Sequence, residues 1–320
     1  MYINYKDDPL KYYGEKKKDN YFEGWYFKHV SSDLKNIISV IPGISKNLND
    51  PHSFIQTIIY TENNGKKSLT TNYHRFSYKD FKYRKDPFSL QIDRNIFKRE
   101  VMILDLFGEY YTLQGRVKYT DFTDIKRNIC SPNAMGYFAY IPNMECYHDI
   151  VSMNHSLKGS LYLNYKLVDF NKGKGYIEKD WGTSFPKDYI WIQSNNFEVS
   201  DASIMCSIAH IPFLNTFFRG FICNFIFNGK EFRFATYNRS KITKEKVIDN
   251  KVEITIEKDN LKLEIKAEIS NRGKLKAPKN GVMDIVIKEG LSGLIDVRLS
   301  RKSEILFQGH GNPCSIEVVV

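Results

Sequence analysis

One short stretch of the chain concentrates residues that could do acid chemistry. Residues 175–195 read GYIEKDWGTSFPKDYIWIQSN and place two carboxylates, Glu178 and Asp180, among large aromatic rings. The other candidate side chains of this stretch are Trp181, Tyr189, Trp191 and Gln193. Carboxylates are costly to bury unless they are paired or neutralised, so this composition is unusual both for a surface and for a core. The stretch is therefore a candidate site, in which a buried carboxyl could donate a proton.

A second group of acids and rings lies near the start of the chain. Residues 21–28 read YFEGWYFK, and strand alternation places Glu23 and Trp25 on one face and Tyr26 on the other. Two interpretations are open for this group. Its residues could bind a substrate, or Trp25 could plug the end of a barrel while Glu23 pairs with a nearby lysine or arginine.

Residues 144–158, MECYHDIVSMNHSLK, add Glu145, His148, Asp149 and His155. No pair among them has the i, i+2 spacing of metal ligands on a strand or the H-E-x-x-H spacing on a helix. We therefore predict no metal site. His155 has a structural alternative as a core histidine bonded to a backbone carbonyl.

Motifs for two common enzyme classes are absent from the sequence. There is no G-x-S-x-G, no P-loop, and no G-x-G-x-x-G followed by a helix, which argues against a serine hydrolase and a nucleotide-dependent enzyme. What remains is acid chemistry in an aromatic-lined apolar cavity.

The elements that must position these residues are strands. Apolar and polar residues alternate with period two over most of the chain, most clearly over 157–167, 252–257 and 261–269. Strands with one buried and one wet face are typical of antiparallel sheet, so the fold class is all-β. The few short helices are expected over 122–130 and 282–290.

The chain length and a weak internal repeat indicate two domains. A lipocalin-like barrel of about eight strands holds one small ligand, and 320 residues suffice for two such barrels. YFEGWYFK at Tyr21 and YIEKDWGTSF at Tyr176 both read as an aromatic, acid and tryptophan opening to a strand. We predict two lipocalin-like antiparallel β-barrel or sandwich domains in tandem, over residues 1–175 and 176–320.

Composition limits the partners and the location. The net charge is +10, but acidic residues are interleaved with basic ones and no nucleic-acid-binding motif is present, so no nucleic acid is expected. Weak attraction to acidic lipid headgroups is favoured over nucleic acid. The five cysteines are widely spaced and the N-terminal residues lack an apolar signal segment. These features predict a cytoplasmic protein, monomeric or weakly dimeric, at most peripheral to a membrane.

The motifs together resemble a known family. GYIEKDWGTSFPKDYIWIQSN, YFEGWYFK and MECYHDIVSMNHSLKGSL are similar to segments of the tocopherol cyclases, a group related to carotenoid hydratases and lipocalin-like pericyclic cyclases of two-barrel architecture. The resemblance implies a cofactor-free ring closure. A buried acid protonates the trisubstituted alkene of a prenylated hydroquinone, and a phenolic oxygen captures the tertiary cation to form a chromanol. The Lys/Asn/Ile-rich composition suggests a bacterial protein, so a related terpenoid-like substrate is also open.

Residue chemistry assigns roles for such a reaction. Asp180 is the first choice as proton donor and Glu178 the second, in a hollow inside the doubled barrel. His155 is a candidate to orient or deprotonate the phenol. The candidates for substrate binding are Trp181, Tyr189, Trp191, Gln193, Glu145, Trp25, Tyr26 and Glu23, with the rings of Trp181, Tyr189 and Trp191 placed to stabilise a cation.

Two other functions fit the same sequence. A non-catalytic carrier of a hydrophobic small molecule also needs an apolar cavity, and only the carboxylates favour catalysis over carriage. A protein-interaction module would use the basic faces for docking and would need no cavity.

Overall fold

The computed structural model describes residues 6–109, 111–199, 201–213 and 216–319, so residues 1–5 of the N-terminal segment lie outside it. Strands dominate the described residues. The helices there are short 3-10 turns: η1 (Gly14–Lys16), η2 (Tyr78–Asp80), η3 (Gly136–Tyr140) and η4 (Thr236–Asn238). None of the helices in these ranges has the length and apolarity needed to cross a membrane.

The first half of the described chain forms a twelve-stranded antiparallel sheet with the order β4-β3-β2-β1-β12-β10-β9-β8-β7-β6-β5, and β11 pairs with β10. Its strands are β1 (Tyr21–Val30), β2 (Asn36–Lys46), β3 (His52–Asn63), β4 (Lys66–Ser77), β5 (Phe81–Arg84), β6 (Ser89–Ile92), β7 (Asn95–Lys98), β8 (Val101–Phe107), β9 (Thr112–Thr123), β10 (Cys146–Leu163), β11 (Lys166–Asp169) and β12 (Lys174–Gly182). The sheet curls around one apolar cluster, which includes Trp25, Ile55, Leu90 and Trp181 from strands far apart in this order.

The second half of the described chain forms a ten-stranded antiparallel sheet with the order β16-β15-β14-β13-β22-β21-β19-β18-β17, and β20 pairs with β21. Its strands are β13 (Tyr189–Ser194), β14 (Ser203–Phe213), β15 (Thr216–Phe227), β16 (Lys230–Ala235), β17 (Lys241–Ile248), β18 (Lys251–Lys258), β19 (Leu261–Glu268), β20 (Arg272–Lys279), β21 (Val282–Arg301) and β22 (Glu304–Val319). A second apolar cluster, with Ile192, Phe225 and Val297, fills its concave side.

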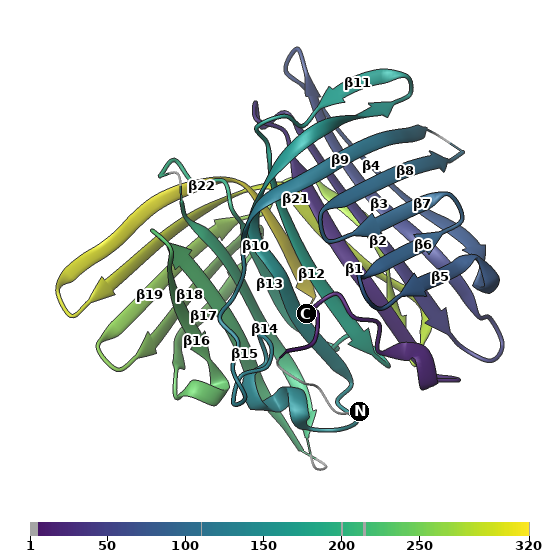
Figure 1. The fold of residues 1–320 in the computed structure, drawn as a ribbon. Coiled ribbons are helices and arrows are strands. Elements are labelled where there is room, and N and C mark those ends of the chain that lie inside the picture. Colours follow the sequence, from purple (N-terminus) through teal and green to yellow (C-terminus); the bar gives the residue numbers. More distant parts are fainter. Residues whose placement is uncertain (1–5, 110, 200, 214–215, 320) are drawn as a thin grey trace.

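The two sheets lie side by side, with β12 and β13 near the middle of the molecule (Figure 1). The outward faces of these strands pack on each other and form a third cluster of buried residues, in which Tyr26 and Tyr176 of the first sheet join Tyr189, Trp191 and Met205 of the second. The largest group of candidate site residues lies at this interface rather than inside either curled sheet.

The all-β prediction is confirmed, and the alternating sequences are strands. In β18, for example, Val252, Ile254 and Ile256 are buried while their neighbours are wetter. The predicted helices are wrong: residues 282–290 belong to β21, and 122–130 leave β9 for a non-helical segment. The β-branched run from Ile285 to Ile287 favours a strand, and β21 is paired on both sides.

The chain passes from one sheet to the other between Gly182 and Tyr189. The division at residues 175 and 176 that the sequence suggested therefore falls within β12. The domain assignment itself, into units 1–175 and 176–320, stays a prediction.

Candidate active site between the two sheets

Strand β12 separates its side chains onto two faces. Glu178 and Asp180 point out of the first sheet toward the second, whereas Lys179 and Trp181 point into the core of the first. This follows from the two-residue repeat of a strand, which sends successive side chains to opposite sides. One strand thus supplies both a cavity wall and a barrel core.

A cavity of about 180 Å³ lies between the two sheets. Its lining is mostly apolar, with Phe22, Phe54, Phe185, Trp191, Met283 and Ile287 among the contributors from both halves of the chain. Four acids also line it: Glu145, Glu178, Asp180 and Glu317. An engineered apolar cavity of about 150 Å³ accommodates benzene, so this space can hold an aromatic ring. The predicted hollow exists, but it lies between the barrels instead of inside one.

Glu178 is buried on the cavity wall and accepts two hydrogen bonds on one oxygen. The Tyr176 hydroxyl donates to Oε2 at 2.5 Å, and Trp191 Nε1 donates to the same atom at 3.0 Å. Burial raises the pKa of Glu178 to about 7 in spite of these donors. The carboxyl is therefore substantially protonated near neutral pH, and its conjugate base has hydrogen-bond donors already in place.

His148 bridges the two carboxyls of β12. The β10–β12 register places it directly opposite Asp180, and its Nδ1 lies 2.8 Å from Asp180 Oδ1. Its Nε2 lies 3.6 Å from Glu178 Oε2. Burial alone would lower the pKa of His148, but the Asp180 and Glu178 carboxylates outweigh burial and raise it to about 9. His148 is thus an imidazolium paired with Asp180, whose side chain is 22% exposed.

Two further glutamates, Glu289 fully buried and Glu317 half-buried, each accept a phenol hydrogen bond. Tyr189 donates to Glu317 Oε2 at 2.7 Å, and Tyr26 donates to Glu289 Oε1 at 2.5 Å. Burial raises the pKa of Glu317 to about 8 and that of Glu289 well above its usual range. Glu289 stands behind the cavity wall, as the cross-strand neighbour of Glu317. Neither glutamate was among the candidates predicted from the sequence, although the position of Glu317 inside the apolar run SIEVVV indicates a buried acid.

Of the other residues predicted from the sequence, four line the cavity, and a fifth lies on a strand that contributes to its wall. Tyr26, Glu145, Tyr189 and Trp191 line the cavity. Burial raises the pKa of Glu145. Gln193 is buried on the same strand as Trp191 but away from the cavity, where its Oε1 accepts a 2.8 Å hydrogen bond from Lys28 Nζ.

Three predicted binding residues lie inside the first sheet, away from the cavity. Glu23 pairs with Lys179 at 2.7 Å, and both side chains are fully buried. Trp25 donates through Nε1 to the Leu10 carbonyl, and Trp181 stacks on Tyr147. The surroundings of Glu23 and Trp25 thus match a structural role better than substrate binding: Glu23 pairs with a lysine, and Trp25 is held in the core. Strand alternation removes Trp181 from the cavity that Asp180 faces.

His155 also lies apart from the cavity. Its ring packs against Tyr119 and Phe122, and its Nδ1 is 3.1 Å from Ser152 Oγ. Burial lowers its pKa well below the usual value. It is therefore a neutral core histidine, although its partner is a serine hydroxyl rather than a backbone carbonyl.

His148, Glu178 and Asp180 offer three possible metal-ligand atoms within 4.8 Å of one another, in the part of the chain that the structure describes. Spacing within one segment could not predict this group, because it combines two strands. Two of the candidate ligand atoms are already engaged, since Nδ1 of His148 bonds Asp180 and Glu178 Oε2 accepts from Tyr176 and Trp191, whereas His148 Nε2 has no hydrogen-bond partner among the described residues. The arrangement fits a hydrogen-bonded proton-transfer group.

Comparisons with known proteins agree with this architecture. Residues 112–319 match the family model described as tocopherol cyclase-like, and this range contains His148, Glu178, Asp180 and Glu317. A search of curated proteins gave no significant match.

Three solved structures are similar in fold. A putative AttH protein from Nitrosomonas europaea is 12% identical, with 93% of each chain covered and a TM-score of 0.54. CghA is 8% identical, covering 100% of this chain and 94% of its own, with a TM-score of 0.59. Kievitone hydratase from Nectria haematococca is 11% identical, covering 97% and 94%, with a TM-score of 0.52. The family match spans more than half of the sequence, so the chain belongs to the tocopherol cyclase-like family.

Proposed function

We propose that this protein closes a ring in a prenylated quinol, or a related terpenoid-like hydrophobic molecule, by acid catalysis in the cavity between the sheets. The observation that carries the proposal is the buried Glu178 carboxyl on the cavity wall. Its pKa is close to neutral pH, and two hydrogen-bond donors face the oxygen that carries the negative charge once the proton has left. The reaction needs no cofactor.

Glu178 suits the role of proton donor. A group that protonates an alkene must keep its proton at neutral pH, which burial against apolar rings achieves. It must also become a stabilised anion as the proton leaves. Tyr176 and Trp191 donate to Oε2, and the His148 imidazolium stands 3.6 Å away. Interactions that strengthen as charge develops lower the barrier rather than the energy of the ground state.

Asp180, the first choice from sequence, fits a different role in this proposal. It faces the cavity as the ion-pair partner of His148, and a carboxylate in such a pair is a base rather than an acid. The hydroxyl of the substrate loses its proton when its oxygen captures the cation. Asp180 is placed to accept that proton.

The proposed step balances as follows. The Glu178 proton bonds to the less substituted alkene carbon, and the π pair leaves a tertiary cation facing Trp191 and Tyr189. The phenolic oxygen bonds to this carbon, and its O–H breaks toward Asp180. Asp180, whose side chain is 22% exposed, then releases this proton to water, Glu178 takes up a proton from water, and His148 stays an imidazolium throughout. Substrate and product are isomers, and the enzyme returns to its starting state.

The test uses geranylhydroquinone as the probe, in heavy water. Wild-type protein is expected to yield the chromanol with one non-exchangeable deuterium at the former alkene carbon, so that mass spectrometry finds the product one mass unit heavier than the substrate. Treatment with a chelator should leave the rate unchanged. Glu178→Gln is expected to lower the rate about 10²- to 10⁴-fold, which is the typical contribution of general-acid catalysis.

Binding of the probe separates the enzyme from a carrier. Quenching of tryptophan fluorescence should give similar affinities for the wild type and for Glu178→Gln, since the two side chains have nearly the same shape. Binding of the probe by the wild type with no conversion and no deuterium uptake would favour carriage. An active Glu178→Gln protein would exclude Glu178 as the donor.

A further inference from the structure

The cavity opens beside exposed aromatic side chains. In η3, Phe138 lines the cavity and its neighbour Tyr137 is 50% exposed. In β15, Phe218 lines the cavity and its neighbour Phe217 is 62% exposed. The rings of Phe138 and Phe218 stack at 5.8 Å and join the two elements. We call Tyr137 and Phe217 the mouth pair.

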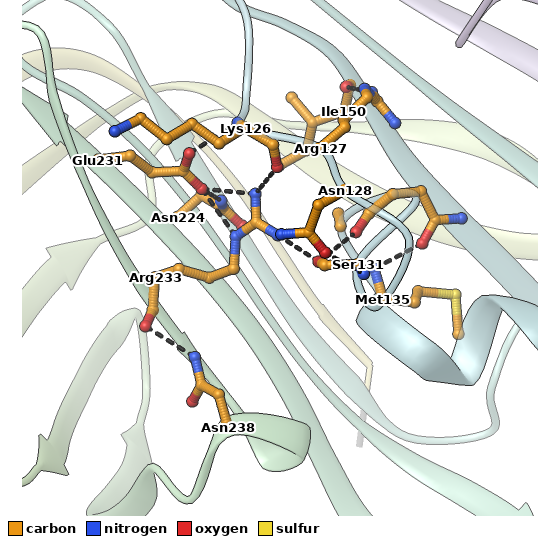
Figure 2. Close-up of polar contacts among 12 residues, drawn as sticks. Lys126, Arg127, Asn128, Ser131, Met135, Ile150, Asn224, Glu231, Arg233 and Asn238 are labelled. Carbon is orange, nitrogen blue, oxygen red and sulfur yellow. Dashed lines mark hydrogen bonds and ion pairs between the residues drawn. The ribbon is translucent and has the colours of Figure 1, made fainter. Parts of the chain in front are cut away.

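The segment that carries Tyr137 is clamped onto the second sheet. Arg233 of β16 donates to the Lys126 carbonyl at 2.6 Å and to Ser131 Oγ at 2.5 Å (Figure 2). Glu231 accepts from the Lys126 amide at 2.7 Å, and Tyr237 donates to the Ala134 carbonyl at 3.0 Å. An apolar patch held in place by such bonds costs little ordering when a partner covers it.

Two lysines also line or adjoin this cavity. Lys276 is exposed and lines the cavity, and Lys187 is exposed directly after the lining residue Pro186. Nearby Asp188 is neutralised by Arg219. The opening therefore presents rings together with positive charge. That combination suits the surface of a membrane containing anionic lipid, where aromatic side chains sit at headgroup level and lysines attract phosphate and carboxylate groups.

We propose that the mouth pair docks this protein on anionic lipid surfaces, with the cavity opening toward the bilayer. The proposal deepens the proposed function, since a prenylated substrate partitions into lipid and would enter directly. Docking itself does not depend on catalysis. The proposed contact lies at η3 and β15.

Sedimentation with vesicles of phosphatidylcholine and phosphatidylserine tests the docking. Replacing both members of the pair, Tyr137→Ser with Phe217→Ser, is expected to weaken vesicle binding at least about tenfold. The matched control is Tyr165→Ser with Leu167→Ser, at an exposed apolar hairpin tip of β10 and β11 where the side chains are 80% and 60% exposed. The control should bind like the wild type.

The outcomes discriminate clearly. Absence of vesicle binding by the wild type would overturn the proposal. The exposed rings would then be a candidate surface for binding another protein. Loss of binding in the hairpin control alone would place the contact at the other end. Turnover of geranylhydroquinone below its solubility limit should be equal in the wild type and the mouth-pair variant. The docking and the catalysis can therefore fail separately.

Discussion

The two faces of the paired strands β1 and β12 hold buried carboxyls in opposite circumstances. On the inner face Glu23, the cross-strand neighbour of Trp181, has a lysine ion pair, two backbone amides and a phenol around it. On the outer face Glu178 has two neutral donors on one oxygen and an imidazolium beyond hydrogen-bond distance. Both carboxyls are buried, and only the outer one borders a cavity.

This difference separates a structural acid from a candidate catalytic one. The Lys179 ammonium also lies over the rings of Tyr13 and Trp181, at 4.1 and 4.7 Å from their centroids. Glu178 has one cationic neighbour, the His148 imidazolium, whose Nε2 lies 3.6 Å from Oε2; burial outweighs this neighbour and raises the pKa of Glu178. The content of acids and rings is similar on both faces, and the partners decide the chemistry.

The largest expected effect is the loss of stability when the inner pair is broken. Glu23→Gln would leave Lys179 buried without its counter-charge, and breaking a buried pair from one side costs about 3–5 kcal/mol. Urea denaturation followed by circular dichroism measures this change. Replacing both partners, Glu23→Gln with Lys179→Met, should recover part of the loss. If Glu23→Gln unfolds at the wild-type urea concentration, the inner pair is not structural.

Replacing the carboxyl on the outer face should instead raise the stability, and by less than breaking the inner pair lowers it. The pKa of Glu178 is about 7 in the folded chain and near 4.5 in the unfolded chain, so the folded state binds more protons between these values. The stability this group contributes is fully present below about pH 4.5 and is lost as the pH rises through about 7. Glu178→Gln should therefore be more stable than the wild type at about pH 8, by on the order of 2 kcal/mol.

Thermal unfolding of both proteins at about pH 5 and pH 8 measures this prediction. The gap between their unfolding temperatures should widen with pH. A gap that stays constant would mean that Glu178 is ionised throughout.

Sequence alone could predict this comparison only in part. Alternation indicated the strands, but the candidate site still grouped Trp181 with Glu178 and Asp180, although a strand sends Trp181 to the opposite face. Alternation could not give the register of β10 against β12, which sets His148 opposite Asp180. A shift of one residue would have turned His148 to the other face. Hence the histidine of the site was passed over in favour of His155.

The cavity was equally out of reach, because it forms where two sheets meet. Glu317 and its partner Tyr189 are 128 residues apart and lie on paired strands. No periodicity within a segment reports a contact of that separation. The acid and aromatic content of residues 175–195 could be recognised in the sequence, whereas the side on which these residues face the second sheet could not.

The pH dependence of the rate sharpens the assignment on the outer face. If Glu178 is the donor, kcat/KM for geranylhydroquinone should fall about tenfold per pH unit above its pKa of about 7. A decline that begins near pH 8 would instead indicate Glu317, whose pKa is raised to about 8. His148 remains protonated over this interval, since its pKa is about 9. The measurement is a rate profile from about pH 6 to pH 9, with folding checked at each pH.

The smallest expected effect compares one tryptophan from each face. Trp191→Phe keeps an aromatic ring in the cavity but removes the 3.0 Å hydrogen bond to Glu178, which stabilises the carboxylate formed during proton transfer. A hydrogen bond to a charged group contributes about 1.5–3 kcal/mol, so kcat should fall roughly tenfold or more while binding of the probe changes little. Trp181→Phe is the matched change on the inner face, where Nε1 of Trp181 has no partner among the described residues. Its kcat should stay within about twofold of the wild type, because the ring touches Tyr147 and Lys179 but not the cavity. Equal losses of kcat in the two variants would show that activity follows the packing of β12 as a whole, and the distinction between its faces would then fail.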